Sequence, residues 1–426
     1  MNVKNVADLG PSERRALFER DAGIEAVRSD VEDIVTTVRE EGDVAVRNYS
    51  REFDDVEVAN LSVADEAERA YDGLDESMRE TIETAAANVR EFHERQVPED
   101  WRDQFGDGEG VRELGRRFRP LKRVGVYAPG GTAAYPSSAI MGVVPAKVAG
   151  VDEIVVCTPP AEEMNPVTLA AIHAAGADEV YAVGGAQAVA AMAYGTESIP
   201  AVQKVAGPGN RWVTAAKGIV QGDVDIDFLA GPSEILVLAD ETAEPEFVAA
   251  DLVAQAEHDS NASVVCVTDD EETAEAVAAA VDEQATGRER EDTIREALAN
   301  DASGVFCARS MSEAILFAEE YAAEHLTIQA DDDEALLARI TNAGSVFLGP
   351  YTPVAAGDYA SGTNHVLPTN GGPKRHGGLS VDHFLRSTTV QRLDRDGLDE
   401  LAETVTTLAE AEGLEAHAES VRRRLD

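Results

Sequence analysis

A glutamine and a histidine three positions apart are the first residues in this sequence whose types and spacing could bind a metal ion. Gln255 and His258 lie in the segment DLVAQAEHD, which we interpret as a helix. Residues three apart on a helix share one face, so both side chains could reach the same ion. Histidine is a common zinc ligand, whereas glutamine is an unusual one. The spacing alone leaves open a metal site or an ordinary helix surface.

Two other pairs join a carboxylate to a histidine. Asp358 lies in the polar, loop-like segment PVAAGDYASGTNH, seven residues before His365, and such a pair could bind metal or transfer protons. Glu324 and His325 are adjacent at the predicted end of a helix, immediately before the strand LTIQA. A buried Glu–His pair would be costly without a function. An exposed histidine at a helix C-terminus, in contrast, is favourable in itself.

The other histidines give weaker signals. His417 lies near the C-terminus, five residues after Glu412, and this spacing alone predicts no role. Two histidines in helical stretches have no polar companion and are interpreted as structural. Two more lie in the glycine-rich segment GGPKRHGGLSVDHF, where a function is possible. These are His93 and His173, and His376 and His383, respectively.

An α/β framework must position these residues, because short β-rich runs alternate with helical stretches from residue 121 onward. Such alternation predicts parallel sheets with helices on their faces. It falls into two series that meet near 230–235, which predicts two α/β domains in a chain of 426 residues. Residues 30–96 are predicted to be helical, and 379–426 to be helix without a strand.

Glycine-rich turns follow three of the predicted strands: APGGT at 128–132, VGGAQA at 183–188 and AGPGN at 206–210. The standard nucleotide motifs, G-x-G-x-x-G after a strand and G-x-x-x-x-G-K-[ST], do not occur. Each turn alone could be a plain strand-to-helix connection, or could bring backbone N–H groups close to a phosphate. Three such turns in one series favour a shared ligand cleft at the carboxyl ends of the strands.

The formal net charge of −45 is extreme and is spread along the chain. Because apolar periodicity is also present, we interpret the acidic residues as the solvated surface of a folded protein that works in concentrated salt. Near 1 M salt the Debye length falls to about 3 Å, which screens the self-repulsion. The charge argues against a nucleic-acid partner, because phosphate binding needs clustered Lys and Arg.

Nothing in the sequence predicts a membrane or secreted protein. The longest apolar runs, such as AVAAMA at 188–193, are far shorter than the roughly 20 residues of a membrane span. The N-terminus lacks the apolar region of a signal peptide, so we expect a cytoplasmic protein. Cys157, Cys266 and Cys307 stand singly in apolar runs and are expected to be buried in strands, not to bind zinc or form disulfides.

Together these segments resemble the histidinol dehydrogenase family over nearly the whole chain, as an acidic member of the haloarchaeal type. The most specific block runs from 225 to 259, where A-G-P-S-E enters a strand and Q-A-E-H follows about twenty residues later. Further segments match in the family's order: RVGVYAPGG, GGAQA, GPGNRWVTAAK, EHL, GDYASGTNHVLPT and EGLEAH. The departures are Trp212, where a smaller aromatic is usual, and the acidic surface.

The resemblance implies a role for each candidate residue. The family's zinc ligands match Gln255, His258, Asp358 and His417, and its catalytic pair matches Glu324 and His325. Substrate contacts would come from Ser233, Gln255, His258, His325, Asp358, Glu412 and His417, and NAD contacts from Tyr127, Gln187 and Asn210.

The implied reaction is a zinc- and NAD-dependent four-electron oxidation of L-histidinol, through L-histidinal, to L-histidine, the last step of histidine biosynthesis. One zinc ion per subunit would hold the substrate against the nicotinamide. His325 would take the hydroxyl proton, and Glu324 would activate a water for the second oxidation. The alternatives are a dehydrogenase of another amino alcohol or diol on the same scaffold, and a zinc hydrolase.

The implied fold is a pair of incomplete Rossmann-like domains with helical N- and C-terminal arms, in a homodimer with shared active sites. We expect an N-terminal arm at 1–25, a first α/β domain formed by 26–120 and 235–378 with the metal and catalytic residues, a second at 121–234 with the NAD-contacting loops, and an arm at 379–426 that crosses to the partner. A conflict remains, because ligands of such sheets usually lie at strand carboxyl ends, whereas Glu324 and His325 are predicted at a helix C-terminus.

Overall fold

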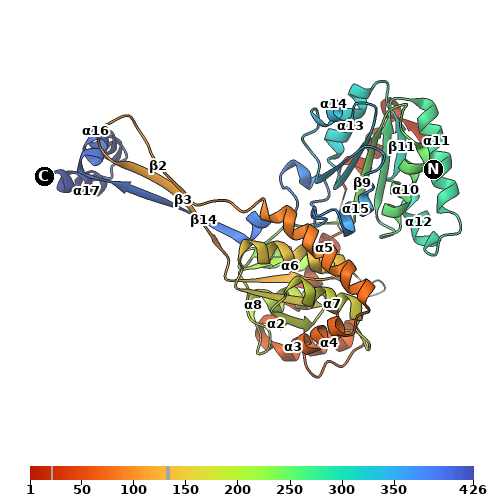
Figure 1. Ribbon diagram of the computed structural model, residues 1–426, viewed down its shortest axis with the longest axis horizontal. Helices are drawn as coiled ribbons and strands as arrows, with labels where there is room; N and C mark the ends of the chain where they lie inside the picture. The colour runs from red at the N-terminus through yellow and green to blue at the C-terminus, as the bar shows by residue number, and fades with distance from the viewer. Residues whose placement is uncertain (21–22, 131–134) are drawn as a thin grey trace. The chain divides into compact units, whose positions relative to one another are not determined.

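The computed structural model describes residues 1–20, 23–130 and 135–426, which fall into two compact units (Figure 1). Unit 1 comprises Met1–Arg95 and Lys122–Phe384, and unit 2 comprises Gln96–Leu121 and Leu385–Asp426. Unit 1 contains two parallel sheets covered by helices, so the predicted α/β class is confirmed. Within these described ranges, no helix is long and apolar enough to cross a membrane.

The first sheet of unit 1 has five parallel strands in the order β6-β5-β4-β7-β8. Counted along the chain, this order is 3-2-1-4-5, that of a doubly wound nucleotide-binding sheet without its sixth strand. Its strands are β4 (Arg123–Tyr127), β5 (Glu153–Thr158), β6 (Glu179–Ala182), β7 (Lys204–Ala206) and β8 (Asp225–Ile226). Its connecting helices are α6 (Pro136–Ala149), α7 (Pro166–Ala175), α8 (Gly185–Tyr194) and α9 (Arg211–Val220).

Helices from the N-terminal part of the chain cover this first sheet. They are α2 (Arg28–Glu41), α3 (Asp43–Phe53), α4 (Ala64–Asp72) and α5 (Glu76–Glu94). α2 packs on α8 and α9, α4 on α7, and α5 on α6. The sequence assigned these helices, within 26–120, to the other α/β domain, and their contacts contradict that assignment. The apolar stripe of α2 at Val31, Ile34 and Val38 predicts a buried face, but it does not reveal which sheet will cover it.

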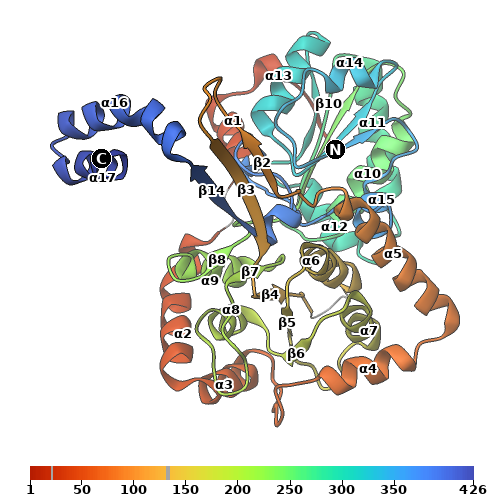
Figure 2. The ribbon, with the colours of Figure 1, turned by 60° about the vertical axis from the view of Figure 1, so that its left-hand side comes forward.

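The second sheet of unit 1 has six parallel strands in the order β1-β11-β10-β9-β12-β13. Figure 2 shows its strand β10 among the helices α10, α11 and α13. From β9 onward the order is again 3-2-1-4-5, and β1 is added at the edge. Residues 1–25 are therefore not a free arm, because Val3–Asn5 pairs with β11. The strands are β1 (Val3–Asn5), β9 (Glu234–Ala239), β10 (Ser263–Thr268), β11 (Gly304–Cys307), β12 (His325–Gln329) and β13 (Ser345–Leu348). The helices are α1 (Pro11–Phe18), α10 (Pro245–Ala256), α11 (Glu271–Ala285), α12 (Glu291–Leu298), α13 (Met311–Tyr321), α14 (Asp333–Leu337) and α15 (Val354–Tyr359).

The central strands of both sheets are mostly apolar, because helices cover both faces of each sheet. β9 and β10 are buried at every residue, as expected for parallel strands between two helical layers. Cys157 in β5 and Cys266 in β10 are buried, as the sequence predicted, whereas Cys307 at the end of β11 is half-buried.

Unit 2 consists of a three-stranded antiparallel sheet and two helices that pack on each other. The sheet has the order β14-β3-β2, with β2 (Trp101–Gln104), β3 (Arg112–Pro120) and β14 (Leu385–Leu393), and the helices are α16 (Arg395–Ala411) and α17 (Glu415–Leu425). The prediction of helix without a strand over 379–426 is therefore wrong, because β14 pairs with β3 along its whole length. β14 escaped detection because its side chains are mostly exposed on both faces, so its sequence carries no apolar alternation.

Candidate active site

Glu324 and His325 lie at the amino end of β12, directly beside the amino end of β9. The two strands are parallel neighbours, and His325 pairs in register with Ile235. α13 already ends at Tyr321, and Ala322 adopts a left-handed conformation with φ 52° that stops the helix. The prediction that Glu324 and His325 end a helix is therefore wrong. His325 begins the buried strand β12 and Glu324 directly precedes it, at the opposite end from the carboxyl edge where such sheets usually bind ligands.

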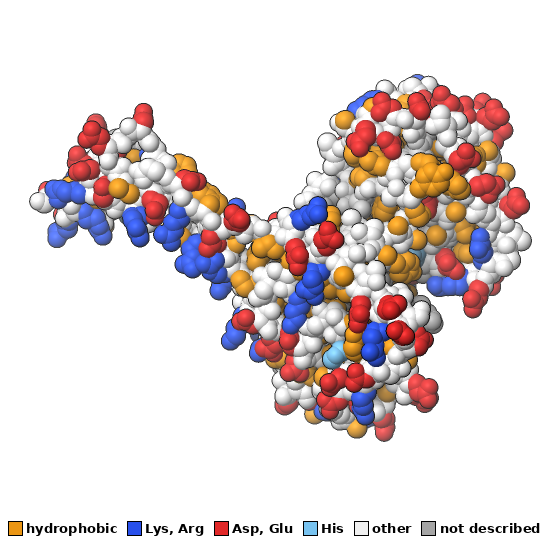
Figure 3. All heavy atoms as spheres, viewed as in Figure 1, with side chains coloured by type: hydrophobic (Ala, Val, Ile, Leu, Met, Phe, Trp, Pro, Cys, Tyr) orange, Lys and Arg blue, Asp and Glu red, His pale blue; other side chains and the backbone are white. Residues whose placement is uncertain are grey.

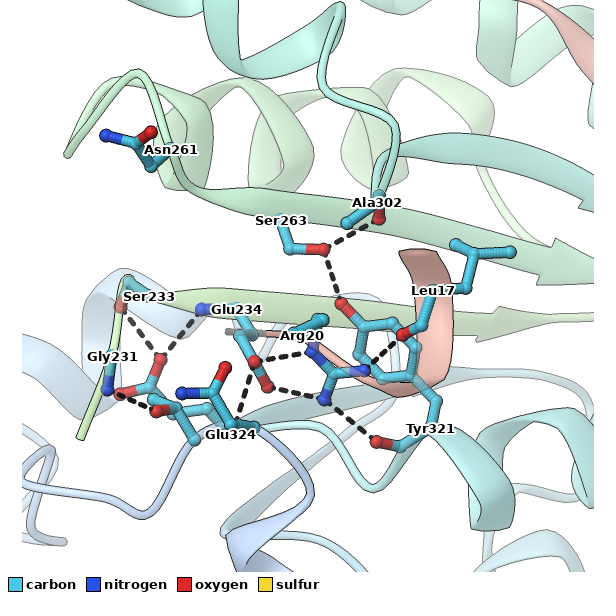
Figure 4. Close-up of polar contacts among 12 residues, drawn as sticks. Leu17, Arg20, Gly231, Ser233, Glu234, Asn261, Ser263, Ala302, Tyr321 and Glu324 are labelled. Carbon is cyan, nitrogen blue, oxygen red and sulfur yellow. Dashed lines mark hydrogen bonds and ion pairs between the residues drawn. The ribbon is translucent and has the colours of Figure 1, made fainter. Parts of the chain in front are cut away.

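The polar contacts of Glu324 come from the strand next to it. The Ser233 hydroxyl donates a hydrogen bond of 2.8 Å to Glu324 Oε2, and the Glu234 backbone N–H donates one of 2.8 Å to the same oxygen (Figure 4). The Glu324 side chain is only 8% exposed, and Ser233 is half-buried. The Glu324 carboxylate is therefore held in one orientation at the amino end of β9.

His325 is oriented by the same segment. Its Nδ1 lies 3.0 Å from the backbone carbonyl oxygen of Glu234, which can only accept, so Nδ1 carries a hydrogen. In the neutral imidazole the basic nitrogen is then Nε2, which is buried and has no hydrogen-bond partner within the described residues. Asp358 Oδ1 lies 3.7 Å from Nε2. The free nitrogen is thus placed to exchange a proton with a ligand.

The charges around His325 favour its protonated form. Burial lowers the pKa of this imidazole, but the Glu324 and Asp358 carboxylates outweigh burial and raise the pKa to about 10. Burial raises the pKa of the Asp358 carboxyl, but the nearby His325 imidazole outweighs burial, so the pKa of Asp358 is lowered. The three side chains form one electrostatically coupled group.

Two of the predicted metal ligands differ in local structure from the expectation. Gln255 is buried in the last turn of α10, and its Nε2 has no hydrogen-bond partner among the described residues. α10 ends at Ala256, so the exposed His258 lies in the turn after the helix and not on its face. Asp358 lies in the short helix α15 and not in a loop. The charge of His258 contributes to the lowered pKa of Asp358.

His365, whose role the sequence left open, is part of this neighbourhood. Its Nδ1 donates to the Asp358 backbone oxygen at 2.8 Å, and its Nε2 lies 3.4 Å from Ser138 Oγ. His365 therefore stabilises the position of the Asp358 backbone. Across the ranges that the structure describes, no group of three His, Cys, Asp or Glu side chains is assembled that could hold a metal ion.

Glu412 and His417 belong to unit 2. Glu412 is the C-terminal cap of α16, and His417 lies in the first turns of α17. Both side chains are exposed. The structure thus divides the sequence-predicted site residues between the two units.

The predicted cofactor residues all follow strands of the five-stranded sheet, at its carboxyl edge. Tyr127 ends β4, and its buried hydroxyl accepts a hydrogen bond of 3.1 Å from the Gly185 N–H. Gln187 is buried in α8. The Asn210 side chain caps α9 by accepting from the backbone N–H groups of Trp212 and Val213, at 3.0 and 3.2 Å. Of the first glycine-rich turn, Gly131 and Thr132 lie outside the described residues.

A polar cavity in unit 1 lies between the start of α9 and the start of β9. It has a volume of about 530 Å³, and its lining includes Asn210 at the start of α9 and Glu234 at the start of β9. Arg20 and Asn370 line it as well. Sequence patterns did not identify Arg20 and Glu234 as residues of the site. Glu234 directly follows Ser233, and this position beside a predicted substrate contact is a signal in the sequence.

Known proteins resemble this chain over its full length. A family model described as histidinol dehydrogenase matches residues 18–425. The histidinol dehydrogenases of Natronomonas pharaonis and Haloarcula marismortui are each 72% identical over 426 residues, with 100% of both chains covered. The crystal structure of histidinol dehydrogenase from Elizabethkingia anophelis matches with a TM-score of 0.94 at 37% identity, covering 100% of this chain and 98% of that chain.

Proposed function

Because the chain belongs to the histidinol dehydrogenase family, we propose that it oxidises L-histidinol, through L-histidinal, to L-histidine. The observation that carries this proposal is the Glu324–His325 pair, in which each side chain is held by a different backbone group of Glu234. The same residues would serve two proton transfers in two successive oxidations, as a four-electron reaction requires.

The first oxidation needs a base at the substrate hydroxyl. His325 Nε2 takes the hydroxyl proton while the carbinol C–H leaves as hydride, and the product is the aldehyde. In the second oxidation a water adds to the aldehyde, and Glu324 takes a proton from it. Among the described residues both hydrogen bonds to Glu324 end on Oε2, so Oε1 remains for this water. The hydrate then loses the second hydride and becomes the carboxylic acid.

NAD⁺, two molecules per turnover, supplies the hydride acceptor in each oxidation. Tyr127, Gln187 and Asn210 would contact it from the carboxyl edge of the five-stranded sheet, where doubly wound folds bind nucleotides. The cavity between Asn210 and Glu234 supports this route, since a cofactor there would reach toward the catalytic pair.

The donor atoms near Asp358 fit a zinc ion. Gln255 would supply the carbonyl oxygen of a buried amide, and Asp358 and His258 would supply the carboxylate and imidazole that zinc accepts. Zinc at these residues would supply Lewis-acid binding of the substrate's amine and imidazole. A cation bound there would also offset the Asp358 charge, and so would favour the neutral form of His325 that can accept a proton.

These three residues leave a fourth zinc position to be filled. We assign it to the partner subunit of a homodimer, through His417, with Glu412 of the same segment contacting the substrate. Unit 2 supports this assignment because it carries large exposed apolar side chains, such as Trp101, Leu408 and Leu414, which are 42%, 60% and 43% exposed. Such side chains are suited to contact with a second copy.

The yield of NADH per histidinol consumed, measured in molar salt, tests the proposed function. We expect a ratio of two, because the alcohol and the aldehyde each release one hydride. A ratio of one would mean that the enzyme stops at the aldehyde. Consumption of substrate without absorbance at 340 nm would instead identify a zinc hydrolase, and NADH formed only with other amino alcohols or diols would identify a dehydrogenase of different specificity.

A further inference from the structure

We propose that Arg20 and Glu234 are positioning residues that hold Glu324 and His325 in their working geometry through the backbone of Glu234. This inference rests on the proposed function for the roles of Glu324 and His325. The Glu234 N–H donates to Glu324 Oε2 at 2.8 Å, and the Glu234 carbonyl accepts from His325 Nδ1 at 3.0 Å. One residue therefore orients both side chains, so any movement of Glu234 displaces both.

The Glu234 side chain is fixed by a buried, two-point ion pair. Arg20 Nε lies 2.6 Å from Oε1, and Arg20 Nη2 lies 3.0 Å from Oε2, with the two side chains 6% and 2% exposed. The Asn370 backbone N–H donates to Oε1 at 2.9 Å. A planar guanidinium that binds both oxygens of a carboxylate defines its plane as well as its position.

Arg20 is in turn held directly by α1 and α13, and through Tyr321 by β10 (Figure 4). It donates to the backbone oxygen of Leu17 in α1 and, at 2.9 Å, to that of Tyr321 at the end of α13. Its guanidinium carbon lies 3.8 Å from the centre of the Tyr321 ring. The Tyr321 hydroxyl lies 2.7 Å from Ser263 Oγ, which donates to the Ala302 carbonyl. The position of Glu234 is thus set by α1, α13 and β10 together.

A purely stabilising role explains this arrangement less well than a geometric one. Desolvation offsets much of the attraction in a buried ion pair, and apolar side chains of similar size often give equal stability. Burial raises the pKa of Glu234, and the nearby Glu324 carboxylate raises it further, while Arg20 opposes both. The ion pair therefore places a second carboxylate, that of Glu234, beside Glu324, which is unfavourable. Its benefit is that it fixes the Glu234 backbone, which binds both Glu324 and His325.

The test is a double substitution, Arg20→Met with Glu234→Gln, in the full-length protein. Methionine and glutamine are neutral and similar in size to the arginine and glutamate that they replace. Glutamine also retains an oxygen that can accept from the Asn370 N–H, so we expect the protein to fold. We expect kcat to fall about 100-fold with both histidinol and histidinal, because a displacement of about 1 Å has that effect on a reacting group. KM should change less than about threefold, since binding in the ground state is retained. Arg20→Lys, which keeps the charge but loses the two-point contact, should give an intermediate loss of kcat.

A matched control is Arg47→Met with Asp43→Asn, which neutralises another buried carboxylate far from the site. Asp43 is bound by Arg47 of α3 and by Thr196 and Ser198 in the loop that follows α8. Circular dichroism and thermal midpoints should show comparable losses of stability in the two double variants, but only the first should lose kcat. Wild-type kcat in a folded Arg20→Met/Glu234→Gln protein, or a rise in KM alone, would overturn the proposal.

The assay also separates this inference from the proposed function. Wild-type protein that forms no NADH from histidinol would refute the function. The positioning role is then judged from a crystal structure of the double variant. We expect the His325 ring to leave its 3.0 Å contact with the Glu234 carbonyl, and an unchanged ring would refute the positioning role.

Discussion

Glu324 and His325 are neighbours in the chain, but their contacts suit two different proton transfers. His325 uses Nδ1 to bind the Glu234 carbonyl and turns Nε2 toward Asp358. Glu324 binds Ser233 and the Glu234 N–H through a single oxygen. At the scale of single residues, function therefore depends on which atom of each side chain is occupied by the protein itself.

The two proton transfers can be separated by substitution. Glutamine at 324 keeps an acceptor oxygen for Ser233 but cannot take a proton from water. We expect Glu324→Gln to slow oxidation of supplied histidinal by about 10²–10⁴-fold and to affect alcohol oxidation far less, whereas His325→Asn should slow both. Turnover measured separately on histidinol and on histidinal checks this. Equal losses in both half-reactions for Glu324→Gln would contradict the division of roles.

The metal ligands give a second prediction at this scale. Dialysis against a strong chelator should abolish activity, and Zn²⁺ should restore it. His258→Ala should lower bound zinc, measured by elemental analysis, because it removes one of the protein ligands. The control His173→Ala changes a half-buried histidine that rests against Tyr71, and it should keep its metal. Unchanged zinc content and turnover in His258→Ala would exclude this ligand set.

Among the elements, the connection from β7 to α9 must bring the chain very close to β4. Gly207 has φ 112°, and a Cβ at this position would lie 2.3 Å from the Tyr127 carbonyl oxygen. Only glycine meets both conditions. The turn thereby places the N-terminus of α9 and its cap, Asn210, beside the strand that carries Tyr127.

Gly207→Ala should therefore distort this connection. We expect a loss of about 2 kcal/mol or more in stability, because both the backbone conformation and the contact are disfavoured. The KM for NAD⁺ should rise, while the KM for histidinol should change little. The matched control is Gly222→Ala, whose added Cβ meets nothing within 4 Å. Thermal unfolding and NAD⁺ titration distinguish the two, and wild-type behaviour of Gly207→Ala would disprove the role of this turn.

The net charge of −45 is the property of the whole molecule with the largest expected effect on its stability. Figure 3 shows acidic side chains distributed over the visible face of unit 1, and arginines along the visible face of unit 2. Self-repulsion of this size is tolerated only where salt shortens the Debye length. The −45 charge therefore points to a protein whose folded state depends on ionic strength.

Lowering the salt from molar concentration to about 0.05 M should unfold or dissociate the protein, because the Debye length grows several-fold over this range. Far-UV circular dichroism and light scattering follow the two events. Sucrose at matched osmolarity is the control, since it stabilises by exclusion without screening charge. A native, unchanged assembly at low salt would rule out the salt-adapted interpretation.

Shared active sites give a further prediction for the whole molecule. His258→Ala and His417→Ala should each be nearly inactive as homodimers. In a mixed dimer one site lacks both ligands and the other retains both, and random pairing makes about half the dimers mixed, so roughly a quarter of the activity should return. The two variants are mixed, dissociated, reassociated and assayed for NADH. If heterodimers form but activity stays at background, His417 serves its own subunit.

The α/β class and the candidate pairs could be predicted from the sequence. Strand–helix alternation and apolar periodicity are local properties, set by the burial of each segment, and they survive in any correct tertiary arrangement. Motif spacing similarly identified Gln255 with His258, and Glu324 with His325, without knowledge of their neighbours.

The contacts between these residues and the rest of the chain could not be predicted from the sequence, because they depend on the tertiary structure. It placed His325 at the amino end of β12 beside β9, joined β14 to β3, and brought Arg20 to Glu234 and Tyr321. Each of these contacts links segments far apart in the chain, and none has a local periodic signal. Their formation depends on many weak contacts that act together across the folded protein, because pairing between distant segments is favourable only once the surrounding core has fixed both of them.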